Sequence, residues 1–213
     1  HSCSRPLRLL LLHRMPKAAE GENDAALQAD LSVEGLFGVS GKVALVTGGG
    51  SGIGAMIAAG FVQNGCKVYV ASRKDTTEYS AALTKQGPGT CHSIVCDVSD
   101  HLQIQNMMED LKRREGKLHI LVNNSGTNYK SPIGQHDMKM FQKVMQLNAN
   151  AVFDTVQEAL PLLEAAATKS DPARVINISS VNGITPPLID IFAYGTSKEP
   201  WPDILYCFSC LGN

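Results

Sequence analysis

The segment TGGGSGIG, from Thr47 to Gly54, directly follows the apolar run Val43 to Val46. That run has the length of a strand and no polar alternation, which is typical of a strand buried on both faces. After Gly52 the apolar residues recur at helical spacing, so the segment predicts a strand that turns into a helix across its glycines. Such a turn offers backbone N–H groups and the positive end of the helix dipole to an anion, which predicts a phosphate-binding loop. An ordinary glycine-rich turn is the alternative.

Composition limits the classes of protein. The chain has 213 residues, 44% hydrophobic and 18% charged, which suits one large domain or two small ones. A net charge of -1 gives no indication of nucleic-acid binding. The apolar run at residues 9–12 is too short to span a membrane, so no membrane partner is expected. Six scattered cysteines, with no set complete enough to bind zinc, predict a reducing, cytoplasmic location and no metal site.

Further strand-like runs alternate with helical patterns along the chain. The strands are expected at residues 67–71, 93–96, 118–122 and 174–178, and a long helix is expected at 138–168, with a kink or break at Pro161. Strands that alternate with helices of this length indicate right-handed crossovers. The sequence therefore predicts an α/β fold: a Rossmann-like, doubly wound parallel sheet with helices on both faces.

Four motifs occur in a fixed order on these elements: TGGGSGIG at 47–54, NNSG at 123–126, NISS at 177–180 and YGTSK at 194–198. Together they make the sequence resemble the short-chain dehydrogenase/reductase family, over about Gly35 to Lys198. The residues at 180–184, taken with YGTSK, look most like the branch of 3-oxoacyl-[acyl-carrier-protein] reductases that includes enzymes of rhamnolipid biosynthesis.

Tyr194 and Lys198 are four residues apart and share one face if they lie on a helix. A nearby ammonium stabilises a phenolate, and the resemblance implies that Tyr194 is the general acid or base. It implies that Ser180 binds the substrate carbonyl, with Ser179 as the competing choice. It also implies that Asn148 holds a water relay to Lys198, whereas a polar residue inside a helix is the plain alternative.

The end of the second strand carries Ser72-Arg73-Lys74, which suits a ribose 2'-phosphate better than a 2'-hydroxyl. We therefore expect NADP(H), while Asp75 keeps NAD(H) open. The cofactor contacts that the loop and the resemblance imply are Gly48, Ser51, Gly52, Ile53, Gly54, Arg73, Asp97, Val98, Asn124, Gly126, Tyr194 and Lys198.

The two ends of the chain differ from the middle. Residues 1–35 are expected to form a flexible arm, with 1–14 either an untranslated leader or a targeting peptide, and residues 36–198 to form the NADP-binding domain. After Lys198 the resemblance stops, and 199–213 are expected to be an aberrant tail, because Pro200 would disrupt the helix. The last strands of the family fold would then be missing, and the strand at 174–178 would become an apolar sheet edge.

Two hypotheses follow. The first is an NADP(H)-dependent oxidoreductase that transfers hydride between nicotinamide and a carbonyl or secondary alcohol, for example a 3-oxoacyl compound. The second is a truncated, catalytically inactive nucleotide-binding fragment or splice product. The expected partner is a small carbonyl or alcohol substrate. A homo-oligomer is implied by the resemblance and put in doubt by the truncation.

Overall fold

The structure is a computed structural model that describes residues 32–185 and 189–198. These residues belong to two compact units, divided after Gly38. The first contains helix α2 (Val33–Phe37), which begins at Ser32, whose hydroxyl accepts a hydrogen bond from the N–H of Gly35 at 3.0 Å. Part of the predicted flexible arm is therefore helical, and residues 1–31 lie outside the described range.

The second unit is built on a parallel sheet of five strands in the order β3-β2-β1-β4-β5. The strands are β1 (Val43–Thr47), β2 (Lys67–Ser72), β3 (Thr90–Val95), β4 (Ile120–Asn123) and β5 (Arg174–Asn177). The central position of β1 confirms that the strand before the glycine loop organises the sheet. The predicted Rossmann-like architecture is confirmed.

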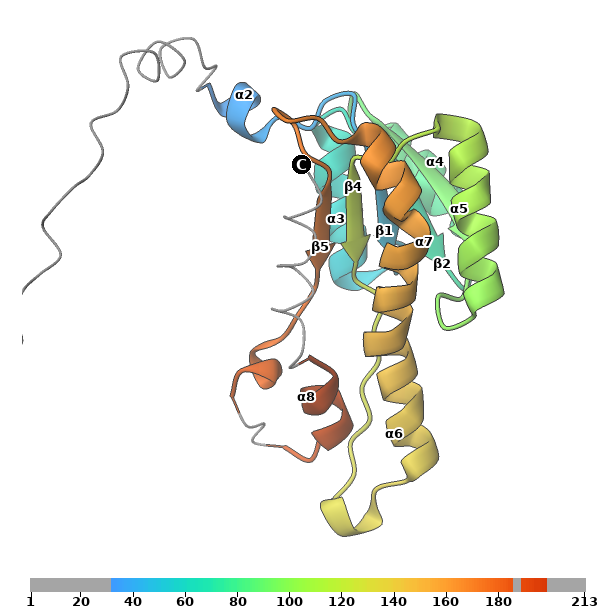
Figure 1. Cartoon of the computed structure of the whole chain (residues 1–213), viewed down its shortest axis with the longest axis vertical. Helices are drawn as coiled ribbons and strands as arrows, with labels where there is room; N and C mark the ends of the chain where they lie inside the picture. Colours follow the sequence, from blue (N-terminus) through green and yellow to red (C-terminus); the bar gives the residue numbers. More distant parts are fainter. Residues whose placement is uncertain (1–31, 186–188, 199–213) are drawn as a thin grey trace, which may run out of the picture. The chain divides into compact units, whose positions relative to one another are not determined.

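Helices cover both faces of this sheet (Figure 1). They are α3 (Gly52–Gln63), α4 (Thr77–Thr84), α5 (His101–Glu115), α6 (Met138–Met145), α7 (Ala151–Ala166) and α8 (Phe192–Lys198), with short 3₁₀ turns η1 (Ile133–Gln135) and η3 (Val181–Gly183). α3 and α4 pack on one face, and α5 and α7 on the other. α8 packs against α6, beside the carboxyl ends of the strands.

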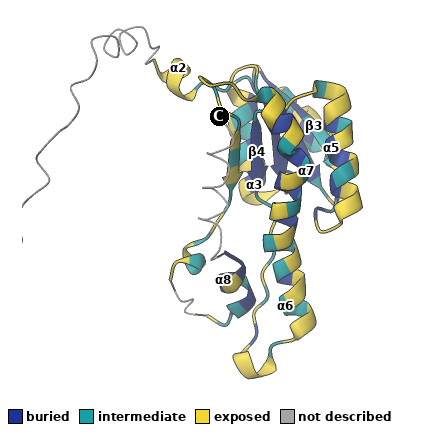
Figure 2. Cartoon of the chain, in the orientation of Figure 1, coloured by how far each residue is buried: buried dark blue, intermediate teal, exposed yellow. Residues whose placement is uncertain are grey.

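Strand β1 shows why the sheet needs both layers. All five of its residues are buried. Ala44 and Val46 join the core under α3, whereas Val43 and Leu45 join the core under α5 and α7. Because successive side chains point to opposite faces, an uninterrupted apolar run is what this position requires. Figure 2 shows the central strands as the most buried part of the unit.

The long helix predicted at 138–168 is interrupted, but not where the sequence analysis placed the break. A π-helical turn, η2 (Gln146–Asn150), separates α6 from α7. Pro161 lies inside α7, so of the predicted kink or break at this residue, the break is wrong. Pro161 is exposed, so water can satisfy the carbonyl that lost its partner, while the buried Leu162 and Leu163 hold this turn on the sheet.

Strand β5 lies at an edge of the described sheet and pairs with β4 alone among the described strands. Ile176 is 41% exposed, in contrast to the fully buried residues of β1. Figure 2 shows the same difference, since β5 is coloured teal and yellow next to dark-blue β4. The described part of the chain therefore contains the expected apolar edge, and the tail at 199–213 lies outside it. In the described residues no helix is both long and apolar enough to span a membrane.

Candidate functional site

The glycine loop between β1 and α3 has the backbone geometry that its sequence predicts. Gly48 and Gly52 have φ values of 65° and 55°, in the left-handed region that glycine adopts most readily. At position 54 a glycine is needed because of a close contact and not because of its backbone angle: a Cβ there would lie 2.3 Å from the carbonyl oxygen of Gly48. Ser51 begins α3 without a capping hydrogen bond from its side chain. The first turn of α3 is therefore available to an anion.

A second segment, after β4, is clamped to this loop. The Thr47 hydroxyl oxygen accepts hydrogen bonds from the backbone N–H groups of Asn124 and Ser125, both at 3.0 Å. The Asn124 side chain donates to the carbonyl oxygens of Thr47 and Gly48 at 3.0 and 3.3 Å. Asn124 is predicted from the sequence as a cofactor contact, whereas Thr47 has no predicted role of its own. In the structure both residues fix the shape of the loop.

The carboxyl ends of the central strands surround a pocket of about 240 Å³, which we call the central pocket. Seven of the predicted cofactor residues line it: Gly48, Ser51, Arg73, Asp97, Val98, Asn124 and Gly126. The other five do not line it: Gly52, Ile53 and Gly54 form the first turn of α3, and Tyr194 and Lys198 lie on α8. Ser72, from the Ser72-Arg73-Lys74 stretch expected at the 2'-phosphate, lines it as well, and so do Cys96, Ser125 and Leu147, which were not predicted as cofactor contacts. Each of these four residues adjoins a predicted one, Leu147 being next to Asn148, so proximity in the sequence was a usable signal.

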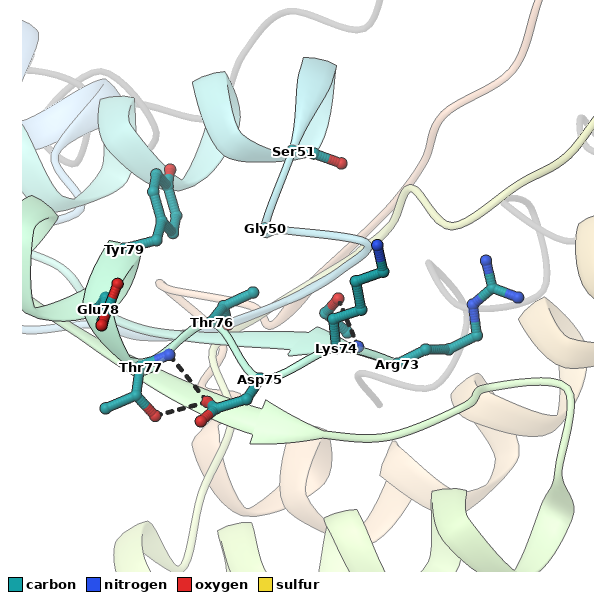
Figure 3. Close-up of a pocket in the computed structure, with 10 residues that line it drawn as sticks. Gly50, Ser51, Arg73, Lys74, Asp75, Thr76, Thr77, Glu78 and Tyr79 are labelled. Carbon is teal, nitrogen blue, oxygen red and sulfur yellow. Dashed lines mark hydrogen bonds between the residues drawn. The ribbon is translucent and has the colours of Figure 1, made fainter.

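An open groove of about 910 Å³, the side groove, adjoins the central pocket at Ser51, Ser72 and Arg73. Figure 3 shows Arg73 and Lys74 extending from the end of β2 near the loop that carries Gly50 and Ser51. Among the described residues, neither cation forms an ion pair. The two cations beside the start of a helix can bind an anion, and the carboxylates of Asp75 and Glu78 line the same groove.

Asp75 lies in the same groove but is engaged by its own helix. Its carboxylate accepts hydrogen bonds from the Thr77 hydroxyl at 2.6 Å and the Thr77 N–H at 2.9 Å (Figure 3). These hydrogen bonds, that of the hydroxyl first, lower the pKa of Asp75. Oδ1 of the carboxylate therefore stabilises the start of α4, while Asp75 still lines the groove.

Helix α8 carries Tyr194 and Lys198 one turn apart. Lys198 is only 6% exposed, and its ammonium donates a hydrogen bond to the Ile178 carbonyl oxygen at 2.7 Å. The same Nζ lies 5.8 Å from the centre of the Tyr194 ring. Burial lowers the pKa of Lys198. The structure thus holds a cation close to a phenol, in a place where water screens it poorly.

The two candidate serines after β5 have different partners. The Ser180 hydroxyl oxygen accepts a hydrogen bond from the N–H of Asn182 at 3.2 Å and begins the 3₁₀ turn η3. The Ser179 hydroxyl donates to the Lys198 carbonyl oxygen at 3.4 Å. Ser179 therefore holds the end of α8, and Ser180 keeps a hydroxyl hydrogen that can be donated to a ligand.

Asn148 lies in the π-helical turn and is completely buried. Its side chain accepts from the N–H of Thr127 at 2.8 Å and donates to the Thr127 carbonyl and the Ser197 hydroxyl, both at 2.9 Å. Leu147, beside it, lines the central pocket. This turn therefore connects the pocket to α8. π-helical turns are frequent at functional sites because they reorient side chains within a helix.

Comparison with known proteins agrees with this arrangement. Residues 42–201 match the family of short chain dehydrogenases. A rhamnolipids biosynthesis 3-oxoacyl-[acyl-carrier-protein] reductase of Pseudomonas aeruginosa is 39% identical over 162 residues, which are 76% of this chain and 63% of the relative. A tropinone reductase homolog of Arabidopsis thaliana is 34% identical over 151 residues, 70% of this chain and 55% of the relative.

Among solved structures, the Pseudomonas aeruginosa RhlG/NADP active-site complex matches with a TM-score of 0.75 and 37% identity. The match covers 79% of this chain and 66% of that one. This chain thus spans less than two thirds of the length of the two curated relatives described above. The predicted resemblance to the rhamnolipid-biosynthesis branch is confirmed, and the chain belongs to the short-chain dehydrogenase/reductase family.

Proposed function

We propose that this chain is an NADP(H)-dependent oxidoreductase that transfers hydride between nicotinamide and a carbonyl or secondary alcohol. One observation carries the proposal. The buried ammonium of Lys198 lies 5.8 Å from the Tyr194 ring, on a helix connected through Asn148 to the pocket that Gly48 and Gly126 line. A phenol beside a buried cation is the pairing expected for an acid or base that works near neutral pH.

The residues present fit a dinucleotide. The loop offers N–H groups at the start of α3 to a pyrophosphate, and Gly54 lets the loop lie directly on the helix. The central pocket and the side groove meet at Arg73, where a 2'-phosphate would find a guanidinium and the neighbouring Lys74. Thr77 engages only Oδ1 of Asp75, so the preference for NADP(H) rests on the cations of Arg73 and Lys74 and not on the lack of an acceptor. These contacts support NADP(H) over NAD(H).

The chemistry follows from the hydroxyl groups. When bound, the cofactor supplies the hydride in reduction or accepts it in oxidation. The Tyr194 hydroxyl donates a proton to the carbonyl oxygen as negative charge develops there, and accepts it in the reverse direction. The Ser180 hydroxyl hydrogen-bonds the same oxygen and stabilises its charge. Lys198 lowers the cost of forming the Tyr194 phenolate through its positive charge.

A second candidate function is a nucleotide-binding protein without turnover. The exposed edge at β5 favours it, because Ile176 is 41% exposed where a buried strand would be covered. The loop, the central pocket and the side groove do not involve this edge. Binding and turnover are therefore separable properties of the chain.

NADPH oxidation, followed at 340 nm with a panel of 3-oxoacyl compounds and simple ketones, tests the proposal. Tyr194→Phe should lower the turnover number by about 10²-fold or more and leave the Kd for NADPH unchanged. Tyr129→Phe, which alters a tyrosine outside α8, is the control and should retain turnover. Absence of NADPH binding would contradict both functions, whereas binding without turnover on any ketone would favour the second.

The remaining expectations belong to the same proposal. The substrate class is a small ketone or its alcohol, with 3-oxoacyl compounds the first to test because the 39%-identical relative is described as such a reductase. Homo-oligomer formation and a cytoplasmic location stay predictions. Sedimentation that shows a monomer would remove the first of these.

A further inference from the structure

Three side chains with metal-binding atoms come together on α5 and α7, away from the pockets. They are His101, Asp154 and Glu158, and their ligand atoms all lie within 4.8 Å of one another. His101 is the first residue of α5, and the two carboxylates are four residues apart on α7, so they share one face of that helix. None of the three lines the central pocket or the side groove. The proposed hydride transfer leaves this cluster unused.

The hydrogen bonds fix the orientation of the imidazole. His101 Nδ1 lies 2.8 and 3.0 Å from the two carboxylate oxygens of Asp154. A carboxylate can only accept, so Nδ1 carries the proton and Nε2 holds the lone pair of the neutral ring. Nε2 in turn lies 4.0 Å from Oε1 of Glu158. A histidine that donates to a carboxylate through one nitrogen and presents the other is the usual arrangement of a metal-binding histidine.

The carboxylate of Glu158 is also oriented by a neighbouring side chain. Gln105, one turn after His101 on α5, donates from Nε2 to Oε1 of Glu158 at 3.4 Å. Each of the two proposed ligands therefore has a hydrogen-bond partner that restricts its rotation. Such partners reduce the entropy lost when a metal binds.

The separation of the two ligand atoms can be compared with that in a metal site. Zinc bonds of about 2.0–2.1 Å at tetrahedral angles place two ligand atoms about 3.4 Å apart. The observed 4.0 Å between Nε2 and Oε1 exceeds this by 0.6 Å. The His101 side chain is 56% exposed and that of Glu158 23%, so small side-chain rotations can close the difference without moving either helix. An imidazole nitrogen with a carboxylate oxygen favours zinc over calcium or magnesium.

We propose that His101 and Glu158 bind a zinc-class divalent cation that connects α5 to α7, with Asp154 positioning His101. Water completes the coordination of the metal. The cluster joins two helices that pack on the same face of the sheet, and none of its residues lines the central pocket. No metal site is predicted from the sequence, because short ligand spacings are absent and His101 and Glu158 are 57 residues apart.

The experiment is isothermal titration of the full chain with Zn²⁺, together with its melting temperature with and without the metal. His101→Gln and Glu158→Gln should each weaken binding about tenfold or more and remove the metal-dependent rise in melting temperature. Glu109→Gln, an exposed carboxylate of α5 outside the cluster, is the matched control and should bind as the wild type does. Because each variant is compared with itself with and without metal, a change in its own stability does not affect the result.

Imidazole ¹⁵N spectra provide a readout that does not depend on affinity. Zinc should shift His101 Nε2 and leave Nδ1 protonated, and Asp154→Asn should weaken binding while keeping Nε2 as the ligand. Equal zinc affinity in wild type and His101→Gln would overturn the proposal, since the metal would then be held elsewhere, for instance by cysteines. A shift at Nδ1 in place of Nε2 would overturn it as well.

Discussion

Gly183 lies directly against the backbone of Lys198: a Cβ at position 183 would come 2.4 Å from the Lys198 carbonyl oxygen and 2.7 Å from its carbonyl carbon. The first residue belongs to the turn that Ser180 begins, and the second ends α8. The contact therefore sets the distance between the serine turn and the helix that carries the tyrosine. Backbone atoms cannot rotate away as the end of a side chain can.

Gly183→Ala should thus displace the end of α8. We expect a loss of about 1–3 kcal/mol in the free energy of unfolding, the usual cost of overpacking, and a fall in turnover with an unchanged Kd for NADPH. The measurements are urea denaturation, steady-state kinetics and a binding titration. Gly134→Ala, at a glycine with no atom within 4 Å of the added Cβ, is the control and should be neutral. Unaltered turnover in Gly183→Ala would show that this contact does not position Lys198.

Gly54→Ala should act on the other end of the site. The added Cβ would lie 2.3 Å from the Gly48 carbonyl oxygen and 2.4 Å from Nδ2 of Asn124, so the phosphate loop must move. We expect at least a tenfold weaker affinity for NADPH and a lower stability. Gly60→Ala is on the same helix with open space around it, and should stabilise the protein by about 0.5–1 kcal/mol through helix propensity. A loss of stability in Gly54→Ala together with a gain in Gly60→Ala would support the close contact between Gly54 and Gly48. A change of the same sign in both variants would argue against it.

The hydrogen bonds that the Thr47 hydroxyl accepts from Asn124 and Ser125 predict an unusual order of stability among substitutions at this position. Thr47→Val keeps the volume but leaves the N–H groups of Asn124 and Ser125 without their acceptor, which costs about 1–3 kcal/mol each if water cannot replace it. Thr47→Ser keeps the hydroxyl and loses a methyl group, at a cost of about 1 kcal/mol. Urea denaturation should therefore give a lower free energy of unfolding for Thr47→Val than for Thr47→Ser. The reverse order would mean that packing, not hydrogen bonding, is the role of this buried residue.

His119 should make stability depend on pH. Its Nδ1 accepts the N–H of Val43 at 3.0 Å, which requires the neutral ring, and burial, aided by the charge of Lys117, lowers the pKa of His119 in the folded protein. The unfolded chain then binds the proton more readily, so the stabilisation is complete above about pH 6.5 and declines as the pH falls below it. His92, whose pKa burial also lowers, contributes in the same direction.

The test is the free energy of unfolding at pH 7.5 and 5.5. His119→Asn keeps an acceptor oxygen for Val43 but cannot be protonated, so it should lose less stability on acidification than the wild type does. His92→Asn in the same background should flatten the dependence further. Identical pH dependence in wild type and His119→Asn would contradict the assignment.

The sequence predicted those parts of the fold that local patterns specify. The unbroken apolar run of β1 followed by glycines indicates a buried strand and a phosphate loop, because both depend on neighbouring residues. The interruption of the long helix was placed at Pro161 because proline removes a helical hydrogen bond, yet the exposed face tolerates that loss. The π-helical turn around Asn148 has no comparable local signal, since it accommodates contacts to Thr127 and Ser197.

For the candidate site, the residue types were accessible from sequence and their contacts were not. Asn124 was predicted as a cofactor contact, and the structure adds that its side chain holds Thr47, 77 residues earlier in the chain. Gly183 lies between the serine and tyrosine motifs, but its necessity appears only when Lys198 is packed on it. Such requirements arise from contacts between segments far apart in sequence, which patterns within a window do not contain.

The central claim is that the loop, the central pocket and the side groove bind NADP(H), and a fluorescence titration with NADPH and NADH tests it most directly. We predict tighter binding of NADPH. In Arg73→Ala the Kd for NADPH should rise about tenfold or more, as expected when a charged hydrogen bond is lost, with little change for NADH. Lys85→Ala, outside both pockets, is the control. NADH binding as tight as NADPH binding, with a ratio that Arg73→Ala leaves unchanged, would contradict the claim.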